Sequence, residues 1–164
     1  TWGVLIAVSN EAGPFYGLID QPYIGERFVG SDLGAYMSGP HGTGRLSTRP
    51  ARDLSQATLF TTFPEVGSEE EGRAFYAVAS RTRLTRYGMD CYAYAMLASG
   101  QIDLVIEAGL QSYDIQAPIA LIEAAGGLVT DWRGNPAHAG GRAIAAANPE
   151  IHAEALSILR KSVE

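Results

Sequence analysis

The sequence is poor in cysteine and lysine, and both shortages carry information. Cys91 is the only cysteine in 164 residues, so no intramolecular disulfide is possible and nothing marks an oxidising compartment. It lies in the apolar stretch "DCYAYAML", where a buried, inert thiol is expected rather than a nucleophile. Lys161 is the only lysine among 12 cationic residues. The excess of arginine suits bidentate ion pairs or phosphate contacts, and a general compositional bias explains it equally well.

Long apolar runs and a basic surface are also missing. No run approaches the roughly 18 apolar residues of a membrane-spanning helix, and the chain shows no signal peptide, so we expect a cytoplasmic protein with no membrane partner. The net charge of -6 disfavours a nucleic-acid partner, because phosphate binding needs a basic face. The opening stretch "TWGVLIAVSN" is typical of the inside of a strand, so we expect the natural start to lie upstream.

Several common site motifs are absent. The histidines His41, His138 and His152 show no metal-ligand spacing, and neither a G-x-S-x-G elbow nor a G-x-x-x-x-G-K-[ST] phosphate loop occurs. "GPHGTG" follows no clear strand and opens no helix, which makes it a weak phosphate cradle. "RTRLTR" could attract a substrate phosphate, although a charged edge strand that resists pairing with other chains is the better interpretation.

What is present is a regular pattern of secondary structure, which fits one domain over residues 1–164. Residues 1–66 predict a β-meander and a loop region. Its predicted strands are 3–8, 15–20, 26–30 and 57–63, with a long loop or a pair of short edge strands over 38–56. Residues 67–164 predict an α/β region. Its predicted helices are 68–80, 89–100, 114–127 and 149–162, and its predicted strands are 83–88, 102–109, 128–132 and 142–148. Such alternation is typical of a layered α/β fold.

Two acidic residues stand out in the stretch "EAGLQSYDIQAP". Glu107 is predicted to close a strand and Asp114 to open the next helix, so both should reach the sheet edge where α/β proteins bind ligands. A simpler interpretation stays open, in which Asp114 caps the helix and Glu107 is solvated. Pro118 favours a helix that starts near Ala117, after a tight or distorted turn.

Longer stretches carry a resemblance to a known family. "YDIQAPIALIEAAGGLVTDWRGNP" resembles the C-terminal signature of the inositol monophosphatase family, while "GLIDQPYIGERFVG" and "TRYGMDCYAYAMLASGQIDLVIEAGLQSYD" resemble its bacterial and plant histidinol-phosphate phosphatase branch. The resemblance covers essentially all of the chain. It implies the C-terminal half of a layered α/β/α/β/α sandwich and a Mg²⁺-dependent, Li⁺-sensitive hydrolase of small phosphate monoesters. Inositol-1-monophosphatase is the alternative, and "RYGMDCYAY" disfavours a sugar-bisphosphate phosphatase.

The resemblance also assigns roles to residues. Asp114 corresponds to a metal-binding Asp of the family, and carboxylate oxygens suit Mg²⁺. Glu107 falls where the family contacts the alcohol portion of the substrate. Gly88 and Asp90 fall at the rim of the same pocket, where an acid would suit a cationic amine or imidazole. For Asp90, a plain helix-start role is equally open.

The chain departs from the family at its front. An earlier Glu-Glu segment and an Asp-Pro-x-Asp-Gly-Thr motif, which supply most metal ligands, do not occur in it, so its catalytic residues remain unassigned. We therefore expect an incomplete, inactive C-terminal portion that forms a homodimer or associates with a missing N-terminal half. A non-catalytic binding or dimerisation remnant is the rival interpretation. Loss of half a sandwich should expose apolar faces, which predicts association or poor solubility.

Overall fold

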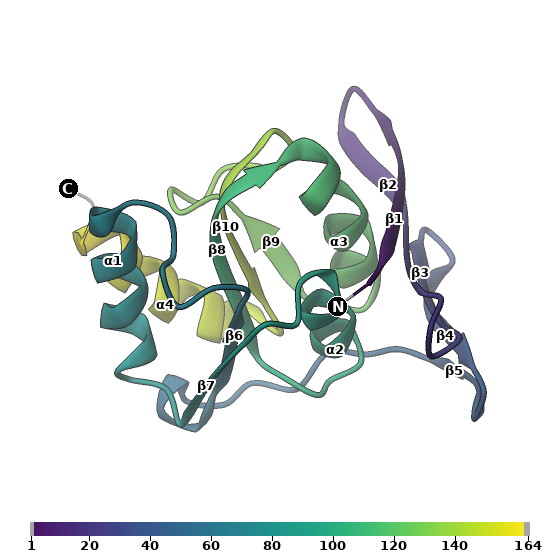
Figure 1. The fold of residues 1–164 in the computed structure, drawn as a ribbon, viewed down its shortest axis with the longest axis horizontal. Coiled ribbons are helices and arrows are strands. Elements are labelled where there is room, and N and C mark those ends of the chain that lie inside the picture. The colour runs from purple at the N-terminus through teal and green to yellow at the C-terminus, as the bar shows by residue number, and fades with distance from the viewer. Residues whose placement is uncertain (1, 163–164) are drawn as a thin grey trace.

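The computed structural model describes residues 2–162, so Thr1, in the opening stretch, lies outside the described range. Its first sheet, sheet A, is the predicted meander, and each strand pairs antiparallel with the next (Figure 1). The strands are β1 (Val4–Asn10), β2 (Gly13–Gln21), β3 (Glu26–Ser31), β4 (Gly34–Gly39) and β5 (Gly42–Arg45). Strand β5 lies within the segment 38–56, for which the sequence left a loop or short edge strands open, whereas β4 begins at Gly34, where no strand was predicted.

The second sheet, sheet B, has the order β7-β6-β8-β10-β9. Its strands are β6 (Thr58–Thr61), β7 (Leu84–Tyr87), β8 (Leu104–Gln111), β9 (Leu128–Thr130) and β10 (Gly140–Ala146). Strand β6 runs parallel to both β7 and β8, while β10 runs antiparallel to β8 and β9. The parallel strands β6, β7 and β8 therefore end at the same edge of the sheet.

Local signals set the helix ends. The helices are α1 (Glu69–Ala79), α2 (Cys91–Ala98), α3 (Ser112–Ala124) and α4 (Pro149–Ser162), with a short 3₁₀ turn, η1, at Leu54–Gln56. Ser68 and Glu71 form a capping box at the start of α1, as the Ser-x-x-Glu spacing predicts. Before α4, the Asn148 side chain accepts a hydrogen bond from the Ile151 N–H at 3.0 Å. Pro149 is the first helical residue, where its missing N–H costs nothing.

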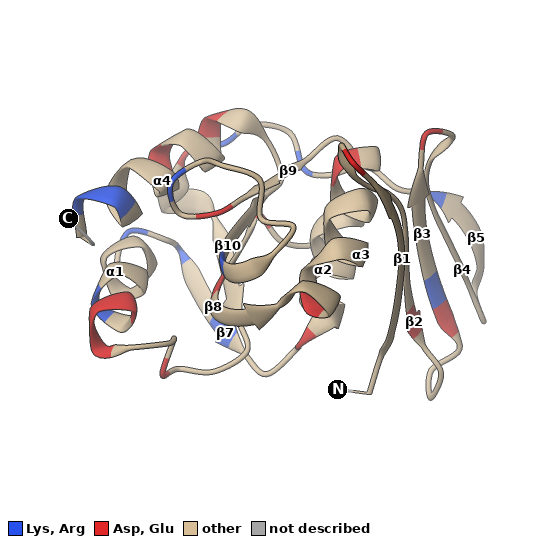
Figure 2. Ribbon diagram, turned by 90° about the horizontal axis from the view of Figure 1, so that it is seen from above, with Lys and Arg blue, Asp and Glu red and all other residues tan. Residues whose placement is uncertain are grey.

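The elements stack as layers. Figures 1 and 2 show α2 and α3 between the two sheets, with α1 and α4 on the far side of sheet B. One hydrophobic core fills the space between the sheets, and a second lies between sheet B and the α1/α4 layer. The described chain is thus a mixed α/β sandwich with four layers in the order sheet A, α2/α3, sheet B, α1/α4.

Helix α3 packs unusually close to sheet A. Gly17 and Gly30 are register partners in β2 and β3, and both face the α3 backbone. A Cβ on Gly17 would overlap the carbonyl oxygen of Ala117, and one on Gly30 would overlap the backbone at Leu121. Glycine is required here because only a residue without a side chain lets strand and helix backbones touch.

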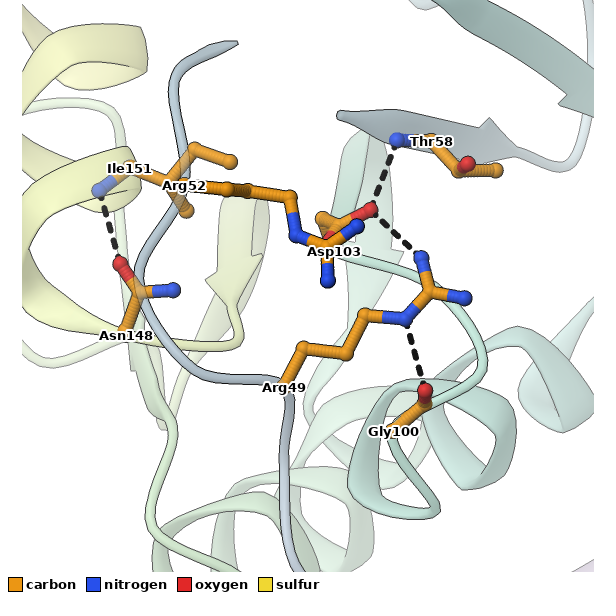
Figure 3. A network of polar contacts seen from close by, with 7 residues as sticks. All are labelled: Arg49, Arg52, Thr58, Gly100, Asp103, Asn148 and Ile151. Atoms are coloured by element: carbon orange, nitrogen blue, oxygen red, sulfur yellow. Dashed lines mark hydrogen bonds and ion pairs between the residues drawn. The ribbon is translucent and has the colours of Figure 1, made fainter. Parts of the chain in front are cut away.

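A buried carboxylate pins the segment that crosses from sheet A to sheet B (Figure 3). Asp103 is fully buried and accepts hydrogen bonds from Arg49 Nη1 at 2.9 Å and from the Thr58 N–H at 2.8 Å. Arg49 Nε also donates to the Gly100 carbonyl at 2.7 Å. Arg52 Nε lies 3.2 Å from the other Asp103 oxygen, an ion-pair distance without hydrogen-bond alignment. Two arginines thus pair with one buried carboxylate, but each does so through a single nitrogen and not in the bidentate manner that the composition suggested as one option.

The side of sheet A that faces away from α3 carries exposed apolar side chains, beside the charged residues Asp20, Arg27 and Arg45. We define this outer face by Val4, Ile6, Val8, Leu18, Val29 and Tyr36, which lie on one side of the sheet by register. Val4, Ile6, Val8 and Tyr36 are 41%, 51%, 45% and 45% exposed. Among residues 2–162, no element lies over this face in Figures 1 and 2. Nor does any helix in the same range have the length and apolar character needed to cross a membrane.

Candidate active site

A cavity of about 380 Å³ lies where the parallel strands of sheet B end. Acidic side chains line it, namely Glu65, Asp90, Glu107 and Asp114, and we call it the acidic pocket. Among residues 2–162, no lysine, arginine or histidine lines it. Its size suits a small-molecule site. Its charge favours a cation, because several carboxylates lining one cleft raise the local concentration of positive ions.

Glu107 is the most firmly held acid of the pocket. Its side chain is only 6% exposed. Oε1 accepts hydrogen bonds from the N–H of Thr62 at 3.0 Å and from the hydroxyl of the same residue, and Oε2 accepts one from the Tyr94 hydroxyl at 2.7 Å. These three donors satisfy the buried carboxylate and fix its orientation. The open interpretation of a solvated Glu107 is therefore wrong.

The position of Glu107 along its strand also differs from the prediction. Strand β8 continues to Gln111, and Glu107 pairs with Ala143 of β10 within the sheet. The register shifts between Gly141 and Ala143, and Gly109 takes a φ of 81°. This irregularity lets the strand run on past Glu107, which was predicted to close it.

Two neighbouring groups stay protonated. Burial, followed by the nearby Glu107 charge, raises the pKa of Tyr94 well above its ordinary value, so Tyr94 keeps its proton and donates a hydrogen bond to the carboxylate. Burial likewise raises the pKa of Cys91, whose Sγ lies 3.5 Å from the Gln21 amide nitrogen. A neutral thiol agrees with the inert role expected from the sequence, although Cys91 is only partly buried and lines the pocket.

Asp114 combines the two roles that the sequence left open. It lines the acidic pocket. Its Oδ2 also accepts a hydrogen bond from the Gln111 N–H at 2.8 Å, as part of a capping box at the start of α3. The expected helix start near Ala117 is wrong, because α3 begins at Ser112 and runs through Pro118. Since proline has no N–H, the Asp114 carbonyl receives no hydrogen bond from that residue within the helix.

Asp90 sits at a strained point of the backbone. Its φ of 45° and ψ of -136° make it the one non-glycine residue in the described range with a positive φ. It is the N-cap residue of α2, but its side chain makes no capping hydrogen bond to that helix. A favourable interaction of its charge with the helix dipole stays open. Strain of this kind persists only where the surroundings enforce it, and it concentrates at functional sites.

Gly88 holds the turn that leads to Asp90 at the acidic pocket. It is not one of the described residues that line the pocket. Its φ is 84°, and its N–H donates to the carbonyl oxygens of Thr61 and Thr62 at 3.2 and 3.0 Å. This contact ties the turn after β7 to the end of β6, two residues before Asp90.

The loop after β6 belongs to the site, and the sequence pattern did not reveal it. Strand β6 ends at Thr61, two residues earlier than predicted, and Thr62, Phe63 and Glu65 then line the pocket. The rule that α/β proteins bind ligands at the carboxyl ends of their strands could have found this loop. Strand β6 is a parallel neighbour of β8, so its carboxyl end reaches the same edge of the sheet as Glu107.

The acids do not form a complete metal site by themselves. Carboxylate oxygens are the ligands that Mg²⁺ prefers. Within residues 2–162, however, no three His, Cys, Asp or Glu side chains lie close enough together to hold an ion. The donor chemistry of the pocket fits a hard cation, and the number of donors fits only part of its ligand set.

Two known proteins with similar sequences are phosphatases by name. The chain is 41% identical over 168 residues to a bifunctional phosphatase, IMPL2, of Arabidopsis thaliana, a match that covers 96% of this chain and 47% of the relative. It is 32% identical to a histidinol-phosphatase of Streptomyces coelicolor, covering 98% of this chain and 62% of the relative. The chain thus spans between about half and two thirds of the length of these relatives.

Solved structures agree with the sequence matches. An inositol monophosphatase from Zymomonas mobilis superposes with a TM-score of 0.90 at 36% identity, over 96% of this chain and 62% of that one. Mycobacterium tuberculosis SuhB gives a TM-score of 0.83 at 25% identity, over 99% of this chain and 65% of that one. The sequence profile of the inositol monophosphatase family matches residues 1–164. The chain therefore belongs to the inositol monophosphatase family.

Proposed function

We propose that this chain forms part of a Mg²⁺-dependent hydrolase of small phosphate monoesters, with the acidic pocket as its site. Histidinol phosphate is the favoured substrate. The observation that carries the proposal is the charge of the pocket, which four acids line without a cationic side chain among the described residues. A phosphate ester is repelled by such a surface unless a cation lies between them. A bound Mg²⁺ would neutralise charge on the phosphoryl oxygens and activate water.

Asp114 is the metal ligand that this chain would supply. The capping bond from Gln111 holds its carboxylate in place without consuming all of its acceptor sites. The remaining ligands would come from a segment outside these residues, because the described part of the chain contains no group of three ligands. On this proposal the 164 residues alone are inactive or nearly so.

Glu107 and Asp90 would bind the alcohol portion of the substrate. Three donors hold the Glu107 carboxylate, which leaves acceptor capacity mainly on Oε2, where only Tyr94 donates. Asp90 lies in a strained turn that Gly88 supports. Two carboxylates suit a cationic amine or imidazole better than a neutral polyol. This preference supports histidinol phosphate over inositol phosphate, as does the name of the Streptomyces relative.

One polypeptide partner could both supply the remaining metal ligands and cover the exposed outer face of sheet A. A polypeptide equivalent to the unmatched part of the relatives would cover the outer face and reach the acidic pocket, which Gly3 and Leu5 of the first strand segment line. A homodimer that buries this face is the alternative. An exposed apolar surface of this kind is typical of an interaction site.

Two alternative functions are each supported by one observation. Inositol-1-monophosphatase is supported by the name of the Zymomonas structure, which has the higher identity of the two solved structures compared. A non-catalytic binding or dimerisation remnant is supported by the incomplete ligand set. The reading frame just before Thr1 separates this remnant from an enzyme, because an Asp-Pro-x-Asp-Gly-Thr codon run there would supply the missing carboxylates.

The test is phosphate release by the protein that the complete reading frame encodes. We expect Mg²⁺-dependent hydrolysis, with a higher kcat/KM for histidinol phosphate than for inositol 1-phosphate. Asp114→Asn should lower the rate by more than about 100-fold, since even outer-sphere changes at metal sites cost up to that factor. Glu150→Gln changes a first-turn acid of α4, on the far side of sheet B, and is the matched control. Full activity of Asp114→Asn would refute its role, and no hydrolysis of either ester would favour the remnant.

A further inference from the structure

Phe63 is a large aromatic side chain left in the open at the acidic pocket. It lines the pocket and is 67% exposed. An exposed phenylalanine forgoes the burial that stabilises most residues of its kind. Its surroundings show why it stays there.

The loop that carries Phe63 is anchored on both sides. Before it, Glu107 accepts hydrogen bonds from the backbone N–H and the hydroxyl of Thr62. After it, the Pro64 carbonyl accepts a hydrogen bond from the Tyr76 hydroxyl at 3.3 Å, and Val66 is buried in the core between sheet B and α1/α4. A residue that precedes proline is also restricted to extended backbone conformations. The Phe63 ring therefore stays at the acidic pocket, because the backbone on both sides of it is anchored.

The chemistry around the ring selects a ligand type. An aromatic face attracts cations and stacks on flat rings, and the acids beside it attract the same positive charge. We infer that Phe63 is a specificity-determining residue whose ring stacks on a planar, cationic ring in the alcohol portion of the substrate, while Glu107 accepts a hydrogen bond from an N–H group of that ring. An imidazolium ring meets both conditions, whereas a polyol ring is neither flat nor charged. The inference rests on the proposed function, because it concerns the substrate of the same pocket.

The experiment is an NMR titration of the complete protein, free of metal, with histidinol as the probe. Stacking on Phe63 should move the imidazole proton resonances of histidinol upfield through the ring current. Phe63→Leu should remove this shift and weaken histidinol binding by about threefold to tenfold. Phe63→Trp should retain both. Tyr23→Leu alters an aromatic residue that is 95% exposed in the turn after β2, and should change neither.

Binding of myo-inositol provides the specificity control, and Phe63→Leu should leave it unchanged. Equal weakening of both ligands would overturn the inference, since Phe63 would then contribute only apolar surface. An unchanged upfield shift in Phe63→Leu, or no binding of histidinol by the wild-type protein, would overturn it as well. None of these results depends on phosphate release, so the inference and the proposed hydrolase activity can fail separately.

Discussion

Asp103 and Arg49 lock the crossing between the two sheets. The Arg49 guanidinium donates to the Asp103 carboxylate at 2.9 Å, and the two side chains are 21% and 0% exposed. Arg49 belongs to the segment that leaves sheet A, while Asp103 directly precedes β8 in the middle of sheet B. The pair therefore joins the strand that carries Glu107 to the first half of the fold.

Removal of the Asp103 carboxylate should destabilise the protein strongly. Asp103→Ala leaves Arg49 and Arg52 without their counter-charge and the Thr58 N–H without its acceptor. We expect the free energy of unfolding to fall by about 3 kcal/mol in urea titrations. The control is Asp20→Ala, whose partner Arg27 is 56% exposed, and which should cost less than about 1 kcal/mol. Similar losses in both variants would contradict a special role for the buried pair.

A methyl group on Gly17 should separate sheet A from α3. Gly17→Ala places a Cβ against the Ala117 carbonyl oxygen, so strand and helix must move apart. We expect a loss of about 2 kcal/mol in the free energy of unfolding, in the range of overpacked cores. Gly44→Ala in β5 is matched, because a Cβ there meets no atom within 4 Å. Thermal unfolding of the two variants should show a clearly lower Tm for Gly17→Ala alone.

His152 should make stability depend on pH below neutrality. Burial, with a smaller contribution from Arg160, lowers its pKa from the ordinary value of 6.5, and its Nε2 lies 2.8 Å from the Thr130 hydroxyl. Below about pH 6.5 the unfolded chain binds a proton at this residue that the folded protein does not, so stability falls with pH. Unfolding titrations between pH 7.5 and 5 should therefore show a steeper decline for the wild type than for His152→Gln, by at most about 1.4 kcal/mol per pH unit. Parallel declines would exclude His152 as a contributor.

Charge on the outer face of sheet A should suppress association without unfolding the protein. Ile6 is 51% exposed on that face, while its neighbour Leu5 points to the opposite side and packs on the core between the sheets. In sedimentation velocity, Ile6→Lys should shift the 164-residue chain towards monomer with little change in Tm. Leu5→Lys should lower the Tm by several degrees. A wild-type chain that is already a stable monomer would contradict association through this face.

Most secondary structure was predictable because its signals are local. The apolar run of β1, the capping box at Ser68 and Glu71, and Asn148 before Pro149 involve residues within a few positions of one another. The start of α3 was not predictable in this way. Proline argued for a start near Ala117, but the Gln111 and Asp114 cap and the packing of α3 on Gly17 and Gly30 outweigh its preference.

The residues of the candidate site also fall into those that the sequence predicted and those that it did not. The sequence singled out Glu107, Asp114 and Asp90, and the fold brings all three to one cavity. It did not reveal Thr62 and Phe63, because their place in the site depends on β6 lying beside β8, a pairing between segments about forty residues apart. Nor did it reveal the Arg49 and Asp103 pair, since nothing local marks two distant charges as partners.

The sequence by itself determined the family, the order of most strands and helices, and three acidic residues of the pocket, Glu107, Asp114 and Asp90, because periodicity, caps and motif spacing are written along the chain. Only the tertiary structure decided that Glu107 is a buried carboxylate held by hydrogen bonds, that Asp90 adopts a strained backbone, and that the exposed Phe63 lines the same pocket. The physical reason is that burial, backbone strain and hydrogen-bond partners depend on which layers of the fold pack together. The packing of sheet B against α2 and α3 brings together segments that are far apart in the sequence.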